Sequence, residues 1–153
     1  MKRVWFSAVL LGLTLTSCSV LQDDNGPLDE MLAAKRRWER LNIDYYSFEF
    51  QMSCECQSVR KVRIYVEADT IHSATYVDDG SPVQPGSGSR VQTIDGLFEW
   101  LIDELRRDPD ESRAWFHQEY HFPRELYIDS RKNVIDDEFW LYVTNFVKHE
   151  RLD

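Results

Sequence analysis

The chain has 153 residues, a formal net charge of −9, 42% hydrophobic residues and 13% aromatic residues. This length and apolar content suit the core of one globular domain, and the negative charge argues against a nucleic-acid partner, because phosphate backbones require clustered lysine and arginine. The one dense basic cluster, Lys35, Arg36, Arg37 and Arg40, is interleaved with Glu39, and we interpret it as a solvated helix face.

The first 18 residues have the layout of an export signal. Lys2 and Arg3 precede an apolar stretch of roughly a dozen residues, too short to span a bilayer as a helix. The stretch ends in Leu-Thr-Ser-Cys at positions 15–18, which resembles the lipobox of bacterial lipoproteins. We therefore expect residues 1–17 to be a signal peptide and Cys18 to carry the lipid, which includes acyl chains such as palmitate. An ordinary signal with a chance cysteine at its end is the alternative.

This resemblance also predicts a location. The lipid on Cys18 would hold the protein at the bacterial cell envelope, facing the periplasm or the exterior, with the membrane as its first partner. Ser19 follows the cysteine where an aspartate would favour the inner membrane, so the outer membrane is favoured if the organism has one. Residues 18–27 read as the lipidated cysteine and a polar tether, and residues 28–153 as a single domain.

The first half of the domain predicts one helix and three strands. Apolar residues recur at helical spacing over residues 28–41, and the period changes to two over residues 45–56. Two further alternating runs predict strands at 62–66 and 71–77, joined by a turn near Ala68 and Asp69. Residues 78–89 are rich in Gly, Pro and Ser and predict a mobile loop.

The second half repeats this order. Thr93 is a candidate N-cap for a helix whose apolar stripe runs from Ile94 to Leu105, and Pro109 follows its end. Strands are expected near 115–120, 125–129 and 139–147, with turns at Phe122-Pro123 and Asn133. The prediction is a two-layer α+β domain in which an antiparallel sheet of about five to six strands packs against two helices.

A set of short motifs resembles a bacterial family of exported proteins known as domain of unknown function 6174. The motifs are Trp38, Tyr46, Phe48, Cys54-Glu55-Cys56, Thr93-Ile94-Asp95 before Leu97-Phe98, Phe122-Pro123, Ile128-Asp129 and Asp136-Asp137-Glu138. The resemblance covers about residues 36–147, and its most specific element is the cysteine pair. His121 departs from it, since glycine is common there. The resemblance implies a fold and a compartment, and it implies no activity.

Cys54 and Cys56 are the candidates for a disulfide in an oxidising compartment. In a regular strand their Cα atoms would be about 6.6 Å apart, at the limit of disulfide geometry, so a bond requires a bulge or the end of the strand. Two reduced cysteines facing the core, or a redox or metal-handling pair, are the alternatives.

The remaining motifs give no prediction of a catalytic residue, metal site or cofactor. His117 and His121 enclose a run that differs from the zinc motif HExxH, because Gln118 occupies the place of the glutamate; in a strand these histidines would also lie about 13 Å apart. The acidic run 136–138 lacks the spaced ligands and glycine of a calcium loop, and we interpret it as a solvated turn.

The aromatic residues of the second half are Trp100, Trp115, Tyr120, Tyr127, Trp140 and Tyr142, and any one of them is expected in the core. If several share an open face of the sheet, that face becomes a candidate docking surface. The predicted function is therefore a non-enzymatic, lipid-anchored module that binds an envelope protein or a small molecule through a sheet face or the 78–89 loop. The alternative is a redox or metal-handling protein acting through Cys54 and Cys56.

Overall fold

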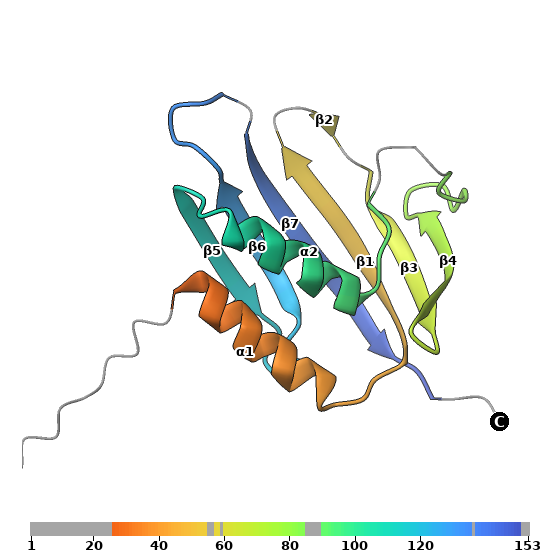
Figure 1. Ribbon diagram of the computed structural model, residues 1–153. Helices are drawn as coiled ribbons and strands as arrows, with labels where there is room; N and C mark the ends of the chain where they lie inside the picture. Colours follow the sequence, from red (N-terminus) through yellow and green to blue (C-terminus); the bar gives the residue numbers. More distant parts are fainter. Residues whose placement is uncertain (1–25, 55–56, 59, 85–89, 136, 151–153) are drawn as a thin grey trace, which may run out of the picture.

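The computed structural model of the chain describes residues 26–54, 57–58, 60–84, 90–135 and 137–150. It contains two helices and one antiparallel sheet (Figure 1), which confirms the predicted two-layer α+β fold. The elements in chain order are α1 Pro27–Glu39, β1 Tyr45–Cys54, β2 Gln57–Ser58, β3 Val62–Glu67, β4 Thr70–Tyr76, α2 Ile94–Arg106, β5 Glu111–Phe116, β6 Pro123–Asp129 and β7 Glu138–Lys148.

The sheet brings the two halves of the chain together at its centre. Its strand order is β4-β3-β1-β7-β6-β5, and the two-residue strand β2 pairs only with the end of β1. The longest strands, β1 and β7, lie side by side with Phe50 opposite Val143 and Met52 opposite Leu141. Each half therefore contributes one helix and three long strands, and neither half forms the whole sheet alone.

Both helices lie on the same face of the sheet (Figure 1). The alternation of β1 and β3 points Tyr46, Phe48, Phe50, Val62, Ile64 and Val66 towards the helices, and all six are at most 2% exposed. Helix α2 packs against these side chains with the predicted apolar stripe from Ile94 to Leu105, and α1 contributes Met31, Ala34 and Trp38 to the same core. Within the described part of the chain, no helix covers the opposite face.

The start of α2 is fixed by hydrogen bonds from two directions. Thr93 is the N-cap, as predicted, and its hydroxyl accepts from the Gly96 backbone N–H at 3.1 Å. The buried Ile94 N–H donates to the Tyr46 hydroxyl at 3.0 Å, which satisfies a backbone donor that the helix itself cannot. Burial raises the pKa of Tyr46, so this hydroxyl stays neutral.

The strand predicted at 115–120 is wrong in position, since β5 spans Glu111–Phe116. Residues 117–122 form a tight turn in which the His117 N–H donates to the Phe122 carbonyl and the His121 N–H donates to the His117 carbonyl. His121 adopts a positive φ of 62°, which explains why glycine suits this position. The start of β5 could not be recognised from the sequence, because Glu111 and Arg113 lie on the side of this edge strand away from the core and give no apolar alternation.

The described part of the expected loop 78–89 is an organised turn. Asp78 and Asp79 both pair with Arg60, and the Asp79 carboxylate accepts from the Ser81 N–H at 2.8 Å. Pro82 then forms an isolated bridge with Thr75 along the edge of β4. Residues 85–89 lie outside the described residues. None of the helices that the structure describes is long and apolar enough to cross a membrane.

Candidate functional site

The face of the sheet opposite the helices carries an organised set of side chains. Residues paired directly across antiparallel strands point to the same face, so the strand register lists this surface row by row. The three rows across β5, β6 and β7 are Glu111, Asp129 and Glu138, then Arg113, Tyr127 and Trp140, then Trp115, Glu125 and Tyr142. We call this surface the open face; Ser53 and Gln51 of β1 extend its second and third rows.

Four aromatic rings form the centre of the open face. Trp115 is 39% exposed, and Tyr127, Trp140 and Tyr142 are half-buried. The planes of Trp115 and Trp140 differ by 12° at a centroid distance of 6.2 Å, and those of Trp140 and Tyr142 differ by 6° at 6.1 Å. Near-parallel aromatic rings whose centroids lie about 4.5–7 Å apart adopt an offset arrangement rather than a face-to-face one. These rings are therefore offset from one another, and they extend over three strands.

The positions of the four rings show that several aromatic residues do share the open face of the sheet. Trp115, Tyr127, Trp140 and Tyr142 belong to the face away from the helices, so the general expectation of core burial is wrong for them. Trp100 and Tyr120 do pack against the core, Trp100 by stacking on Phe139 and Tyr120 by contact with Phe146. Several aromatic side chains therefore share one open sheet face, the condition set for a docking surface.

Carboxylates surround these rings. Glu111, Asp129 and Glu138 lie directly opposite one another across three strands, an arrangement that like charges disfavour. Burial raises the pKa of Asp129, and the charges of Asp137 and Glu138 raise it further. Burial likewise raises the pKa of Tyr127, with contributions from Asp129 and Glu111. Arg113 is the only basic residue in the three rows, and it pairs with Glu111, as does Lys132 at 3.9 Å from outside the rows. The excess negative charge beside the rings therefore lies on Glu125, Asp129 and Glu138.

A buried carboxylate lies on the same side of the sheet, nearer β3. Glu49 is 4% exposed and accepts hydrogen bonds from Arg63 at 2.7 Å and from Asn145 at 2.8 Å, with Lys61 at 3.7 Å. Burial alone would raise the pKa of Glu49, but these hydrogen bonds and positive charges outweigh it and lower the pKa. Asn145 reaches the carboxylate from a position with a φ of 51° in β7, beside a register shift between β1 and β7.

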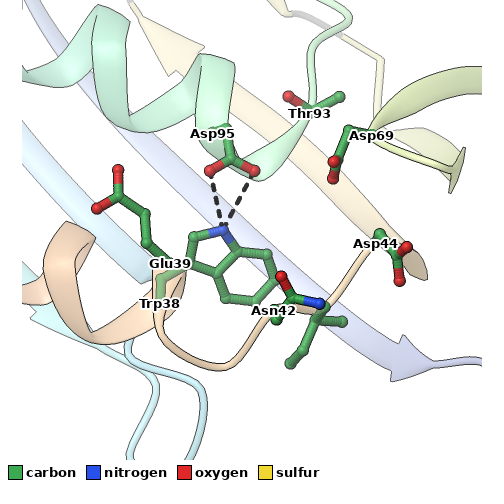
Figure 2. A pocket seen from close by; sticks show the side chains of 8 residues that line it. Trp38, Glu39, Asn42, Asp44, Asp69, Thr93 and Asp95 are labelled. Atoms are coloured by element: carbon green, nitrogen blue, oxygen red, sulfur yellow. Dashed lines mark hydrogen bonds between the residues drawn. The ribbon is translucent and has the colours of Figure 1, made fainter.

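A cavity of about 380 Å³ lies on the other side of the molecule, where the end of α1 meets the start of α2 (Figure 2). The Trp38 indole N–H donates to both carboxylate oxygens of Asp95 at 3.2 Å. Burial raises the pKa of Asp95, and this hydrogen bond opposes the rise. The contact joins the two helices, and Asp44 and Asp69 add negative charge at the rim (Figure 2).

The predicted cysteine site is described only in part. Cys54 is the last residue of β1, and its partner across the turn is Gln57 of β2, so the strand ends where the disulfide prediction required an ending. Cys18 and Cys56 lie outside the described residues. Both the lipid on Cys18 and the bond between Cys54 and Cys56 therefore stay predictions.

The histidine pair is placed differently from the prediction. His117 and His121 lie at two positions of one turn, so the argument from strand spacing does not apply to them. The His117 Nδ1 accepts from the backbone N–H groups of Glu119 and Tyr120 at 3.2 Å, which gives this imidazole a structural role. Of the acidic run 136–138, Asp137 and Glu138 are half-buried and Asp136 lies outside the described residues. The described residues contain no group of three or more metal-ligating side chains.

Sequence reasoning missed the acidic row and the Glu49 network. Both depend on which strands become neighbours, and residues 49, 63 and 145 are far apart in the chain. A signal for the open face was present in β7, where Trp140 and Tyr142 alternate with the core residues Leu141 and Val143. Large aromatic residues on the face of a strand opposite its core residues indicate that this second face has a use of its own.

Comparison with known protein families gives one match. The model of the family of unknown function DUF6174 matches residues 30–148, well over half of the chain. No curated protein matches.

Proposed function

Because this chain belongs to the DUF6174 family, a family of unknown function, its role has to be argued from its own surface, and we propose that it is a lipid-anchored binding module. Its open face would hold a partner that carries basic side chains. The observation that supports this proposal best is the strip of four aromatic rings bordered by carboxylates on a sheet face that no described helix covers.

The aromatic rings supply the contact area. Trp, Tyr and Arg are the residue types that dominate protein interfaces, and Trp115, Trp140 and Tyr142 together with Arg113 bring them within one patch. A cation placed over the face of a tryptophan gains about 0.5–2 kcal/mol, more as the contact loses water. An arginine or lysine of a partner therefore finds a favourable surface here.

The carboxylates supply the selectivity. Glu111, Glu125, Asp129 and Glu138 border the rings, and the nearby cations Arg113 and Lys132 both pair with Glu111, which leaves three carboxylates in excess. Opposite charge across an interface steers association and rejects acidic partners, whereas a neutral sugar would use the carboxylates only as hydrogen-bond acceptors and would not be steered by their charge. The surface chemistry thus favours a basic polypeptide segment over a neutral glycan.

Peptide titration tests this proposal. The full chain is titrated with an arginine- and glycine-containing peptide and, separately, with its glutamate counterpart, and binding is followed by calorimetry. We expect binding of the basic peptide only, and a loss of roughly tenfold in affinity in Trp115→Ala, the size of loss that removal of a central aromatic contact causes.

The matched control is Leu41→Ala, because Leu41 and Trp115 have the same exposed fraction, 39%, and Leu41 lies just beyond α1. Equal affinity in the two variants would contradict the proposal. So would binding of a neutral oligosaccharide, such as a cell-wall glycan fragment, in place of the basic peptide.

The anchor is a separate part of the proposal. The lipobox-like residues 15–18 support lipid attachment at Cys18 and placement at the cell envelope. We expect growth with labelled palmitate to mark the full chain and to leave the Cys18→Ser variant unmarked, with Cys54→Ser as the matched control that stays marked. An unmodified Cys18 in mass spectrometry of the purified protein would contradict the anchor and leave the peptide test unaffected.

A further inference from the structure

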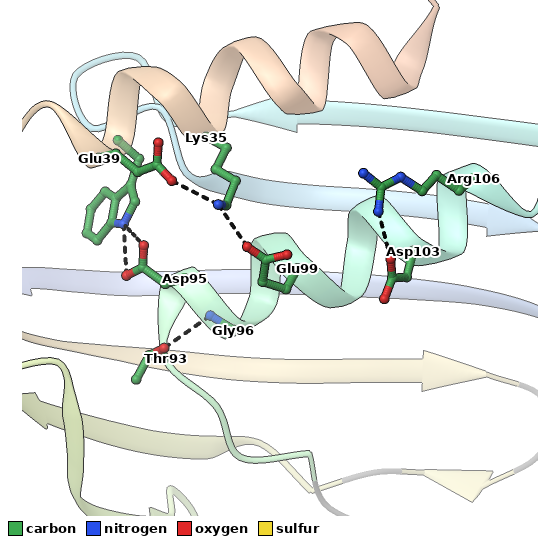
Figure 3. A network of polar contacts seen from close by, with 9 residues as sticks. Lys35, Glu39, Thr93, Asp95, Gly96, Glu99, Asp103 and Arg106 are labelled. Atoms are coloured by element: carbon green, nitrogen blue, oxygen red, sulfur yellow. Dashed lines mark hydrogen bonds and ion pairs between the residues drawn. The ribbon is translucent and has the colours of Figure 1, made fainter.

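Helix α1 carries three basic side chains that have no partner among the described residues. Arg36, Arg37 and Arg40 are exposed and make no ion pair or side-chain hydrogen bond there. The fourth member of the basic cluster differs, because Lys35 pairs with Glu39 and with Glu99 of α2, both at 2.8 Å (Figure 3). The free positive charge of the helix is therefore confined to the three arginines, which we call the arginine cluster.

Two members of the cluster, Arg36 and Arg40, point away from the sheet, while Arg37 lies beside Phe116 at the end of β5. Successive residues of a helix are about 100° apart, so Arg36 and Arg40 each lie about 160° around the helix from the buried Trp38. Arg36 and Arg40 are four residues apart, a spacing at which like charges disfavour a helix. The end of α1 favours positive charge through the helix dipole, which offsets part of this repulsion.

The cluster also lies close to the proposed anchor along the chain. Pro27, the first residue of α1, lies nine positions after Cys18, and at 3.3–3.6 Å per residue this segment reaches at most about 32 Å. Of all described elements, α1 is therefore the one closest to the proposed anchor along the chain. In a chain of net charge −9, the outward side of its last turn is positive, whereas its first turn carries Asp29, about 180° around the helix from Trp38.

We infer that the arginine cluster of α1 rests on anionic phospholipid headgroups of the bilayer that the lipid anchor enters, and that this contact turns the open face of the sheet away from the membrane. The inference rests on the proposed anchor at Cys18. Because α1 and the open face lie on opposite sides of the sheet (Figure 1), one contact fixes both orientations. The open face then points towards a partner in the space beyond the membrane.

The expected strength is enough to orient a tethered domain. A basic residue beside an anionic membrane favours association by a factor of about five, so three arginines favour the oriented state by about a hundredfold. The contact acts over the Debye length of about 8 Å at physiological salt, and it fades when salt shortens that length to about 3 Å at 1 M.

Arginine labelling tests the orientation in the intact protein. The full chain, purified from bacteria with its lipid, is reconstituted into vesicles of phosphatidylcholine alone or with a third of phosphatidylglycerol. An arginine-specific dicarbonyl reagent is then added, and modification of each arginine is measured by mass spectrometry. We expect Arg36, Arg37 and Arg40 to be modified at least five times more slowly on the anionic vesicles, and this protection to disappear in 1 M salt.

Arg63 and Arg113 are the internal controls, since both project from the open side of the sheet and their side chains are 59% and 60% exposed. Their modification should be the same on both vesicles. A variant with Arg36, Arg37 and Arg40 all changed to Glu should float with both vesicles and lose binding of the basic peptide on the anionic ones, because its open face is no longer held outwards. The matched variant with Arg106, Arg124 and Arg131 changed to Glu should keep that binding.

Three results would overturn the inference: equal modification of the arginine cluster on the two vesicles, protection of Arg113 together with the cluster, or a wild-type chain that floats with neither vesicle. The last would remove the anchor as well. Failure of the basic peptide to bind in solution would instead contradict the proposed function alone, since the labelling pattern does not depend on it.

Discussion

A single carboxylate shows how this protein keeps charge inside a sheet. Glu49 has 4% of its surface exposed, yet Arg63, Asn145 and Lys61 approach it from three directions. The two charged partners are in contact with water, Arg63 at 59% and Lys61 at 35% side-chain exposure, so water screens part of their attraction to Glu49. The two short hydrogen bonds therefore account for more of the stabilisation than the net charge does.

Glu49→Gln is expected to destabilise the fold by about 1–2 kcal/mol at pH 7, because the amide keeps the shape and loses the charge-assisted hydrogen bonds. The folded state lowers the pKa of Glu49 below its ordinary value of 4.5. The stabilisation is then complete above pH 4.5 and is lost as the pH falls through the folded pKa. Urea unfolding of both proteins at pH 7 and pH 3 measures the difference, which should be smaller at the lower pH. The exposed Glu30→Gln is the control, and a difference that is the same at both pH values would contradict the assignment.

The hairpin between β3 and β4 shows what a turn demands of its residues. Ala68 and Asp69 both have positive φ, 47° and 58°, as a two-residue type I′ turn requires. Asp tolerates this region, but Ala pays a steric penalty there that Gly avoids. The sequence predicted a turn at these two residues and gave no indication of its type, since Ala is an uncommon choice.

Ala68→Gly is therefore expected to stabilise the protein by about 0.5–1 kcal/mol. This value is the free energy of the backbone strain that the change removes, reduced by the free energy that the greater entropy of the unfolded chain costs. Ala33→Gly is expected to destabilise the protein instead, because Ala33 lies inside α1, where Gly costs about 1 kcal/mol relative to Ala. Thermal unfolding of the two variants gives both values in one experiment. A loss of stability in both would show that the positive φ of Ala68 carries no strain.

The long elements followed from sequence because their patterns are local. The stripe of α2, its N-cap Thr93 and the alternation of β1 predicted those elements to within a few residues. Strand β5 and the turn at 117–122 could not be predicted this way, since the side chains of an edge strand alternate weakly and a histidine in place of glycine disguised the turn. The pairing of β1 with β7, and with it the open face, depends on contacts between residues about a hundred positions apart.

At the scale of the whole molecule, the two sides of the sheet differ in their side chains. The helix side holds the core and, through α1, the side that we infer to meet the membrane, while the other side gathers aromatic rings and negative charge. The open face, the side that we propose to bind a partner, also holds carboxylates whose negative charges repel one another. Asp129 lies between Glu111 and Glu138, and one of its oxygens is buried without a hydrogen-bond partner among the described residues. A basic partner would relieve this crowding.

This crowding predicts a pH dependence of binding. Burial and the neighbouring carboxylates raise the pKa of Asp129 above its ordinary value of 3.8, so this group gains its proton earlier than other carboxylates as the pH falls. Affinity for the basic peptide should therefore be constant near neutral pH and decline as the pH falls towards the raised pKa, since protonation removes the charge that attracts the peptide. Calorimetric titrations between pH 7 and pH 4 measure this decline. Asp129→Asn should bind more weakly at pH 7 and respond less to pH, whereas Asp103→Asn on α2 should follow the wild type. Affinity that rises as the pH falls would mean that the partner of the open face is not basic.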